Sequence, residues 1–120
     1  MPILNCGMAC QFNTSELVPL EELDHYIQDA LDLIAFANAP ATTAWGRRRA
    51  QMGHPAPFNL KMIGIGNEQW GPQYVERYQA FAAASRNGAS TAALVPSTTR
   101  ETPTSRHRWI DSWVRTPPPT

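Results

Sequence analysis

The chain has 120 residues, which suits one compact domain, and its ten Lys and Arg residues balance ten Asp and Glu residues to a formal net charge of zero. Zero net charge argues against the broad basic surface that nucleic acids or anionic membranes attract, so we expect neither partner. No apolar stretch reaches the ~18 residues of a membrane span, and the amino terminus lacks the basic flank of a secretory signal. Two cysteines are too few for a disulfide scaffold or a zinc site, and we expect no metal or cofactor.

The first predicted elements are a strand and a helix. Residues 2–6 form a short apolar run ended by glycine, which is typical of a buried strand. Residues 19–38 are predicted to be helical, because apolar residues recur at steps of three and four and acidic residues occupy the first turns. The apolar stripe consists of Leu20, Leu23, Ile27, Ala30, Leu31 and Ile34. Asp24, Gln28 and Asp32 lie on another side, which we expect to face solvent.

A connection of 21 residues, 39–59, separates this helix from the next strand, whereas the median connection has about 4 to 6 residues. It carries Arg47, Arg48 and Arg49, which we interpret as a solvated or locally paired face, with an anion-binding patch as the alternative. His54 lies between Gly and Pro and is interpreted as a turn residue, with a ligand or general base as the alternative.

A second strand is predicted over residues 61–66 and a second helix from Pro72 to about Ala82. The two glycines of the strand allow a neighbouring backbone to approach closely. The order strand, helix, strand, helix predicts right-handed crossovers and a parallel sheet, so the expected class is α/β.

The composition changes near residue 82. Residues 1–82 carry five basic and eight acidic side chains, whereas residues 83–120 carry five basic and two acidic ones. Ser and Thr number 12 in this second part and 4 in the first, and neither helical nor strand periodicity persists there. We therefore predict an ordered domain over 1–84 and a disordered Pro-, Ser-, Thr- and Arg-rich tail over 85–120.

The most informative chemical signal follows the second strand, at Asn67, Glu68 and Trp70. The loops after parallel strands converge on one pocket in (β/α)8 enzymes, and a carboxylate there has the position of a catalytic acid. An asparagine can hydrogen-bond a substrate hydroxyl, and a tryptophan can offer an apolar face to a sugar ring. The alternative is structural, with Glu68 capping the next helix and Trp70 lying in the core.

Several spaced motifs in residues 2–82 together resemble the central region of glycoside hydrolase family 51, the retaining α-L-arabinofuranosidases. These motifs are Leu23-Asp24, Ile27 to Ile34, Phe36-Ala37-Asn38, Trp45-Gly46, Arg49, Gly53-His54-Pro55, Pro57, Lys61 and Ile65-Gly66-Asn67-Glu68. The resemblance covers about two thirds of the chain. It implies a (β/α)8 barrel in which the two predicted strands are the third and fourth.

The resemblance also implies roles for individual residues. Glu68 would be the general acid/base and Asn67 the ligand of the arabinose 2-hydroxyl, while Trp70 and the 39–59 connection would line the sugar site. The substrates would be arabinan or arabinoxylan with terminal arabinofuranosyl groups, in L-arabinose metabolism. Relatives of full length are often homo-oligomers.

The sequence departs from the family in two respects. A retaining glycosidase needs a second carboxyl group about 5 to 5.5 Å from the acid, and no acidic residue of the matching region stands at another strand end. The family also has a fifth strand after the second helix, where this chain turns to Ser, Thr, Arg and Pro. These departures suggest a partial barrel with a frameshifted tail, which would be marginally stable and inactive by itself.

Two alternatives to an arabinofuranosidase segment remain open. The first is a non-catalytic interaction segment whose basic, Pro-rich tail binds an acidic partner. Other barrel glycosidases also place Asn-Glu after the fourth strand, so a different family is the narrower alternative. The Trp-Gly and Gly-His-Pro motifs favour an arabinofuranosidase.

Overall fold

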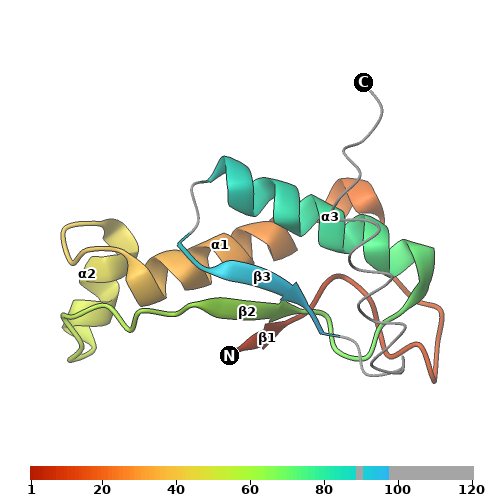
Figure 1. The fold of residues 1–120 in the computed structure, drawn as a ribbon, viewed down its shortest axis with the longest axis horizontal. Coiled ribbons are helices and arrows are strands. Elements are labelled where there is room, and N and C mark those ends of the chain that lie inside the picture. The colour runs from red at the N-terminus through yellow and green to blue at the C-terminus, as the bar shows by residue number, and fades with distance from the viewer. Residues whose placement is uncertain (89–90, 98–120) are drawn as a thin grey trace.

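The computed structural model describes residues 1–88 and 91–97 (Figure 1). Its elements in chain order are β1 (Ile3–Leu4), the 3-10 turn η1 (Leu20–Glu22), α1 (Asp24–Asn38), α2 (Ala44–Gln51), β2 (Met62–Ile65), α3 (Gly71–Asn87) and β3 (Ala93–Pro96). Both predicted strands and both predicted helices are confirmed. No helix in the described part of the chain has both the length and the hydropathy that crossing a membrane requires.

The strands form one parallel sheet in the order β1-β2-β3, with β2 in the centre. Ile3 lies beside Gly64, and Gly64 lies beside Val95, so these three positions share one face. Each strand therefore pairs with the next strand along the chain. This order, with a helix in every crossover, is the arrangement that repeating βα units produce.

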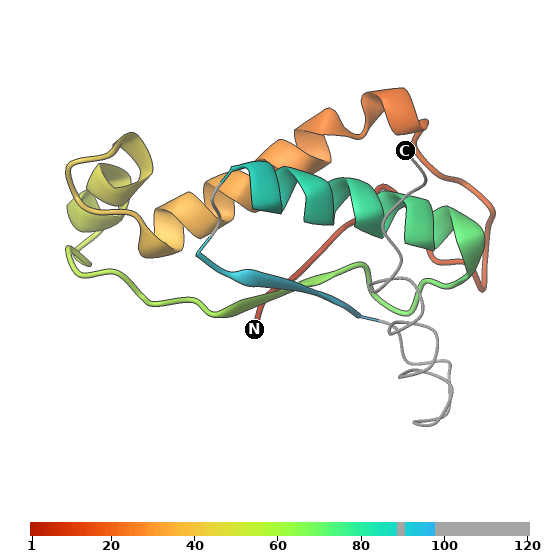
Figure 2. The same cartoon turned by 45° about the horizontal axis from the view of Figure 1, so that its top comes forward.

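Helices α1 and α3 lie side by side along one face of the sheet (Figures 1 and 2). Ile63 and Ile65 of β2 are fully buried against them. The core also contains Cys6, Met8, Leu23, Ala30, Ile34, Tyr74, Phe81 and Ala92. The predicted apolar stripe of α1 thus supplies core residues, and Gln28 on its outer side donates to Asp32 at 2.9 Å, as expected for a solvated surface.

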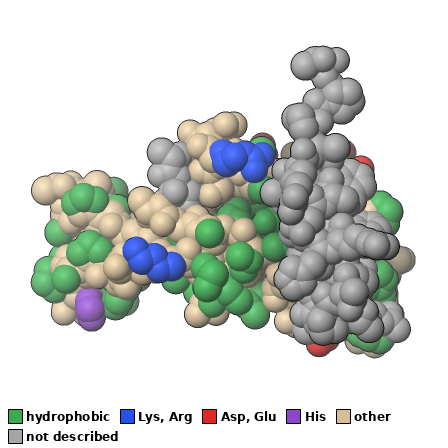
Figure 3. Space-filling model, viewed as in Figure 1, with side chains coloured by type: hydrophobic (Ala, Val, Ile, Leu, Met, Phe, Trp, Pro, Cys, Tyr) green, Lys and Arg blue, Asp and Glu red, His purple; other side chains and the backbone are tan. Residues whose placement is uncertain are grey.

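The opposite face of the sheet carries no helix within the described residues. Ile3 and Met62 point to it and remain 47% and 48% exposed. Figure 3 shows hydrophobic side chains gathered over the strands. A helix on one face only distinguishes this sheet from a doubly wound one, which carries helices on both faces.

The expected connection over 39–59 contains a helix that the sequence analysis did not predict, α2. Thr43 caps it by accepting a hydrogen bond from the Gly46 N–H at 3.2 Å. A Cβ at position 46 would lie 2.0 Å from the Pro40 carbonyl oxygen, so only glycine allows this approach. This helix is polar and mostly exposed. Its sequence therefore lacks the apolar residues at intervals of three and four from which the other helices were predicted.

Arg49 of α2 corrects the interpretation of the three arginines. Arg47 and Arg48 are exposed as expected, but Arg49 is fully buried. Its guanidinium donates to the carbonyl oxygens of Phe36, Ala39, His54 and Pro55 at 2.8 to 2.9 Å. Arg49 therefore ties α2 to the end of α1 and to the segment that follows α2. Its neighbour His54 is exposed and packs on Phe58, with ring centroids 4.2 Å apart.

The predicted start of disorder at residue 85 is wrong. Helix α3 continues to Asn87, and residues 93–96 form β3 beside β2. The strand is an apolar run of four residues within a segment rich in Ser and Thr, so averaging over the segment concealed it. The remainder of the predicted tail, residues 89–90 and 98–120, lies outside the described residues.

Candidate functional site

The turn between β2 and α3 places Asn67 and Glu68 just beyond the carboxyl end of the central strand. Gly66 begins the turn with φ +76°, and a Cβ there would lie 2.8 Å from the Tyr74 ring. Glu68 has φ +61°, a left-handed conformation that is uncommon for residues other than glycine. Both side chains are exposed. The turn therefore presents an amide and a carboxylate at the sheet edge where the sequence placed them.

Hydrogen bonds from the end of β3 hold this turn. The Glu68 N–H donates to the Ser97 carbonyl oxygen at 3.0 Å. The Tyr74 hydroxyl donates to the Ile65 carbonyl oxygen at 2.7 Å and accepts from the Ser97 N–H at 3.2 Å. Burial raises the pKa of Tyr74, so its hydroxyl keeps the proton that this bond needs. Helix α3 is thereby joined to the ends of two strands.

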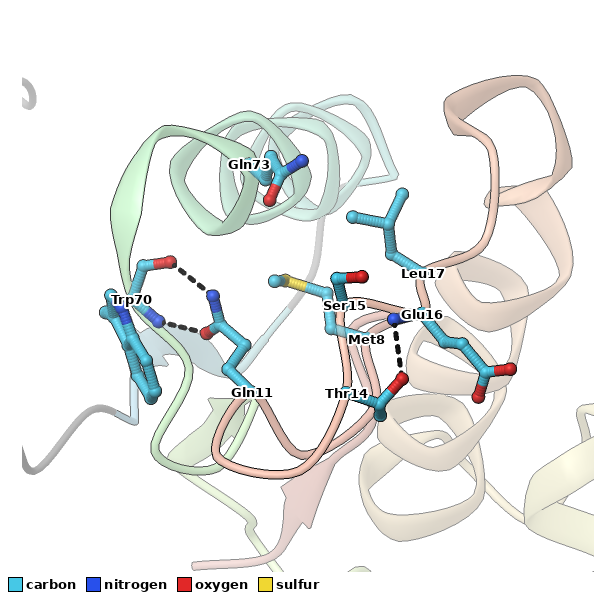
Figure 4. Close-up of a pocket in the computed structure, with 8 residues that line it drawn as sticks. All are labelled: Met8, Gln11, Thr14, Ser15, Glu16, Leu17, Trp70 and Gln73. Carbon is cyan, nitrogen blue, oxygen red and sulfur yellow. Dashed lines mark hydrogen bonds between the residues drawn. The ribbon is translucent and has the colours of Figure 1, made fainter.

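Trp70 is held from the other side, by the loop that follows β1. The side-chain oxygen of Gln11 accepts from the Trp70 N–H at 2.7 Å, and its side-chain nitrogen donates to the Trp70 carbonyl oxygen at 3.1 Å (Figure 4). The ring of Phe12 meets the half-buried Trp70 ring edge-on, with centroids 5.4 Å apart. Trp70 thus lies between the first loop and the start of α3.

A hollow of about 120 Å³ opens between this loop and α3 (Figure 4). Its lining consists of Met8, Gln11, Thr14, Ser15, Glu16, Leu17, Trp70 and Gln73. Hydroxyl, amide and carboxylate groups stand beside one indole ring, a mixture suited to a polar, hydroxyl-bearing ligand. Glu68 and Asn67 do not line it.

The end of β1 contributes Asn5 and Cys6 to the same edge of the sheet. The Asn5 side-chain oxygen accepts from the Gly7 N–H at 2.7 Å and from the Met8 N–H at 3.3 Å, so it fixes the start of the loop. Cys6 is fully buried, and burial raises the pKa of its thiol despite the nearby Arg77 guanidinium. A buried, protonated thiol is a packing group and a poor nucleophile.

The chemistry available at this edge is that of a carboxyl group with polar neighbours. Among residues 1–88 and 91–97 no three His, Cys, Asp or Glu side chains come together as a metal site would require. The other acidic residues in those ranges lie on η1, α1 and α3, except Glu16 of the first loop. A carboxyl group can in general donate or accept a proton.

The structure brings Asn67, Glu68 and Trp70 together in one turn but separates residues 39–59 from them. Helix α2 lies near the amino end of β2, at the opposite end of the sheet (Figure 1). The expectation that residues 39–59 line the same site is therefore wrong, because a segment that leads into a parallel strand ends up away from the loops that leave it. Trp70 occupies the N-cap position of α3 and is half-buried.

Sequence reasoning missed the residues that hold the turn, Gln11, Tyr74 and Ser97. Tyr74 lies within the predicted second helix, whose sequence gives no sign of a contact with the strand ends. Gln11 lies in a loop without periodicity, and Ser97 lies in the supposed tail. Their roles depend on contacts between segments far apart in the chain, such as the 59 positions between Gln11 and Trp70, and no local pattern signals them.

The comparisons with known sequences include several proteins named as arabinofuranosidases. The alpha-L-arabinofuranosidase 1 domain family matches residues 1–118. An extracellular exo-alpha-L-arabinofuranosidase of Streptomyces chartreusis is 52% identical over 63 residues, which are 52% of this chain and 8% of that protein. Alpha-L-arabinofuranosidase 2 of Arabidopsis thaliana is 37% identical over 79 residues, 62% of this chain and 11% of the relative. A probable alpha-L-arabinofuranosidase A of Aspergillus oryzae is 30% identical over 103 residues, 81% of this chain and 16% of the relative.

Among solved structures, arabinose-bound MgGH51 α-L-arabinofuranosidase matches with a TM-score of 0.62 and 26% identity, over 84% of this chain and 16% of that one. The chain thus spans less than a fifth of the length of these relatives. The family match runs to residue 118, beyond residue 82 where we expected the resemblance to end. With almost the whole chain matched, the protein belongs to the alpha-L-arabinofuranosidase 1 domain family.

Proposed function

We propose that this chain carries the acid/base half of the active site of a retaining α-L-arabinofuranosidase, with Glu68 as the general acid/base. The observation that carries the proposal is the position of Glu68, immediately after the central parallel strand and bonded through its N–H to the end of the next strand. The relatives that share this region are named as arabinofuranosidases. The substrates we infer are polysaccharides or oligosaccharides with terminal, non-reducing arabinofuranosyl groups.

The fold that we infer for this segment is one arc of a (β/α)8 barrel, with β1 and β2 as the third and fourth strands. The in-order parallel sheet, with α1 and α3 on one face and an apolar opposite face, supports this assignment. On that numbering β3 is the fifth strand. Barrel enzymes of this type gather their catalytic groups at the carboxyl ends of the strands, where Glu68 lies.

The chemistry of a retaining glycosidase divides between two carboxyl groups. In the proposed reaction Glu68 donates its proton to the glycosidic oxygen as the bond to the anomeric carbon breaks, while a second carboxylate forms a bond to that carbon. Glu68 then takes a proton from the water that releases arabinose. Asn67 would donate a hydrogen bond to a sugar hydroxyl, and Trp70 would pack against the sugar.

The test is a hybrid enzyme in which this chain replaces the matching segment of the Aspergillus oryzae relative, which aligns with it over 103 residues. We expect Glu68→Gln to lower turnover of arabino-oligosaccharides, which need protonation of a poor leaving group, by about 10²- to 10⁴-fold. A dinitrophenyl arabinofuranoside has a leaving group that needs no proton, so the rate at which it forms the glycosyl-enzyme should fall far less. Release of arabinose from the glycosyl-enzyme needs Glu68 as a base for water. Added azide, which needs no base, should restore that second step and yield arabinosyl azide.

The matched control is Glu76→Gln, because Glu76 is an exposed carboxylate on the neighbouring helix α3. It should leave both rates within twofold of the parent hybrid. Equal losses on both substrates for Glu68→Gln, or no loss on either, would contradict the assignment of Glu68 as the acid.

A further inference from the structure

The side chain of Gln11 pairs with the main chain of Trp70 through two hydrogen bonds, as the main chain of a neighbouring strand would. Its oxygen and nitrogen pair with the N–H and the carbonyl oxygen of the same residue, at 2.7 and 3.1 Å (Figure 4). A carboxamide that uses both ends on one residue fixes that residue in position and orientation. Trp70 has extended backbone angles, φ −149° and ψ 172°, and its own side chain does not cap α3. Gln11 therefore fixes the point at which the turn enters the helix.

The turn needs such support because its backbone is strained. Glu68 has φ +61°, and a residue other than glycine in that region has a strained backbone. Such conformations persist only where the surroundings impose them. Without external hydrogen bonds, Glu68 would relax to an ordinary conformation and its carboxylate would move.

Among the described residues, three bond to the main chain of residues 67–70 from different places. Ser97, after β3, accepts from the Glu68 N–H. Gln69, within the turn, accepts from the Asn67 N–H. Gln11, after β1, holds Trp70. Of the three, only Gln11 links the turn to the loop on the β1 side.

We propose that Gln11 is a positioning residue for Glu68, holding the acid/base turn in place through the main chain of Trp70. This inference rests on the proposed function of Glu68. Gln11 lines the hollow beside Trp70, and one hydrogen bond at each end of its carboxamide goes to the main chain of Trp70. It acts through the backbone, two residues from the carboxylate.

The first measurement uses the 120-residue chain itself, labelled with ¹⁵N. Gln11→Leu keeps the approximate size of the side chain and removes both hydrogen bonds. We expect the heteronuclear NOE values of Glu68 and Trp70 to fall clearly below those of α3, which should stay at their parent values. Gln73→Leu is the matched control, because Gln73 lines the same hollow from α3 and is exposed (Figure 4). It should leave Glu68 unchanged.

A second variant covers the case in which Gln11→Leu unfolds the chain. Gln11→Glu keeps the acceptor for the Trp70 N–H and loses the donor to the carbonyl oxygen, so it should give NOE values between those of the parent and of Gln11→Leu. Unchanged NOE values at Glu68 in both variants would overturn the proposal.

The second measurement separates this proposal from the proposed function. In the hybrid enzyme, Gln11→Leu should lower kcat about tenfold or more and change KM less than twofold, because a small displacement of a catalytic group acts on the transition state. When Glu68→Gln is already present, Gln11→Leu should lower kcat by less than a further factor of two. A full additional loss there would overturn positioning through Glu68. If Glu68→Gln alone leaves the hybrid fully active, the proposed function fails while the NOE result still decides the role of Gln11.

Discussion

At the scale of single residues, the two arginines buried among the described residues bond to carbonyl oxygens, although the Nε of Arg77 has no hydrogen-bond partner. Arg49 donates to four carbonyl oxygens around α2, and Arg77 donates to those of Gln73 and Val18. Carbonyls that lie at helix ends and in loops have no partner within a regular element, so a planar guanidinium with five N–H groups suits them well. Arginine here closes irregular segments onto the core.

Replacing Arg49 tests this role. Arg49→Lys keeps the charge, but one ammonium group cannot reach four carbonyl oxygens, so we expect α2 to detach more readily by about 2 kcal/mol, or about thirtyfold in the opening equilibrium. Limited trypsin digestion, followed by mass spectrometry, should show faster cleavage within residues 44–51. Arg48→Lys is the control, because Arg48 is exposed in the same helix. Equal cleavage rates in the two variants would contradict the role given to Arg49.

At the scale of elements, α3 connects the ends of two strands through one hydroxyl group. Tyr74 of α3 bonds to Ile65 at the end of β2 and to Ser97 after β3. Tyr78, one turn further on, donates to the Leu94 carbonyl oxygen at 2.9 Å. The helix is therefore held to the sheet by polar contacts as well as by burial of Phe81.

The raised pKa of Tyr74 predicts an alkaline loss of stability. Unfolded tyrosine loses its proton near pH 10, whereas burial raises the pKa in the folded chain, so above about pH 10 the unfolded state binds fewer protons and the free energy of unfolding falls. Tyr74→Phe removes this contribution. The urea concentration at the midpoint of unfolding, followed by the circular dichroism of the helices, should fall less steeply from pH 9 to 11 in the variant than in the parent chain. At pH 7 the free energy of unfolding of the variant should be about 1 kcal/mol lower.

Parallel slopes for parent and variant would contradict this prediction. The slope that remains in Tyr74→Phe is expected to come partly from Tyr78, because burial raises the pKa of that residue too.

How far the sequence predicted these elements depends on the kind of signal each one carries. Strands β1 and β2 have apolar runs and α1 has a regular apolar stripe, and the sequence predicted all three. Helix α2 has a polar sequence held by Thr43, Gly46 and Arg49, so its signal lies in contacts rather than in periodicity. Strand β3 is only four residues long and depends on pairing with β2. Asn67, Glu68 and Trp70 were recognised by motif, whereas Gln11 depends on tertiary contact.

At the scale of the whole molecule, the described sheet leaves apolar surface and strand edges exposed. β1 and β3 each pair with β2 alone, and Ile3 and Met62 are about half exposed on the face without helices. Unpaired edges and exposed apolar faces favour association between chains and leave folding only marginally favourable.

We therefore expect the 120-residue chain by itself to unfold over a broad temperature range and to hydrolyse an aryl α-L-arabinofuranoside no faster than buffer. Calorimetry and release of the aryl chromophore measure the two outcomes. A sharp transition together with turnover that Glu68→Gln abolishes would contradict this prediction.

The pairing of β2 with both neighbours has a consequence for the order in which the chain folds. The β2–α3–β3 unit closes over about 30 residues, whereas β1 joins β2 across about 60, so the entropy of closing the loop favours the shorter unit first. Glu68 lies inside that unit, and Gln11 belongs to the segment that arrives with β1. The carboxylate is thus placed roughly by a local folding event, and its final orientation waits for the most distant part of the sequence.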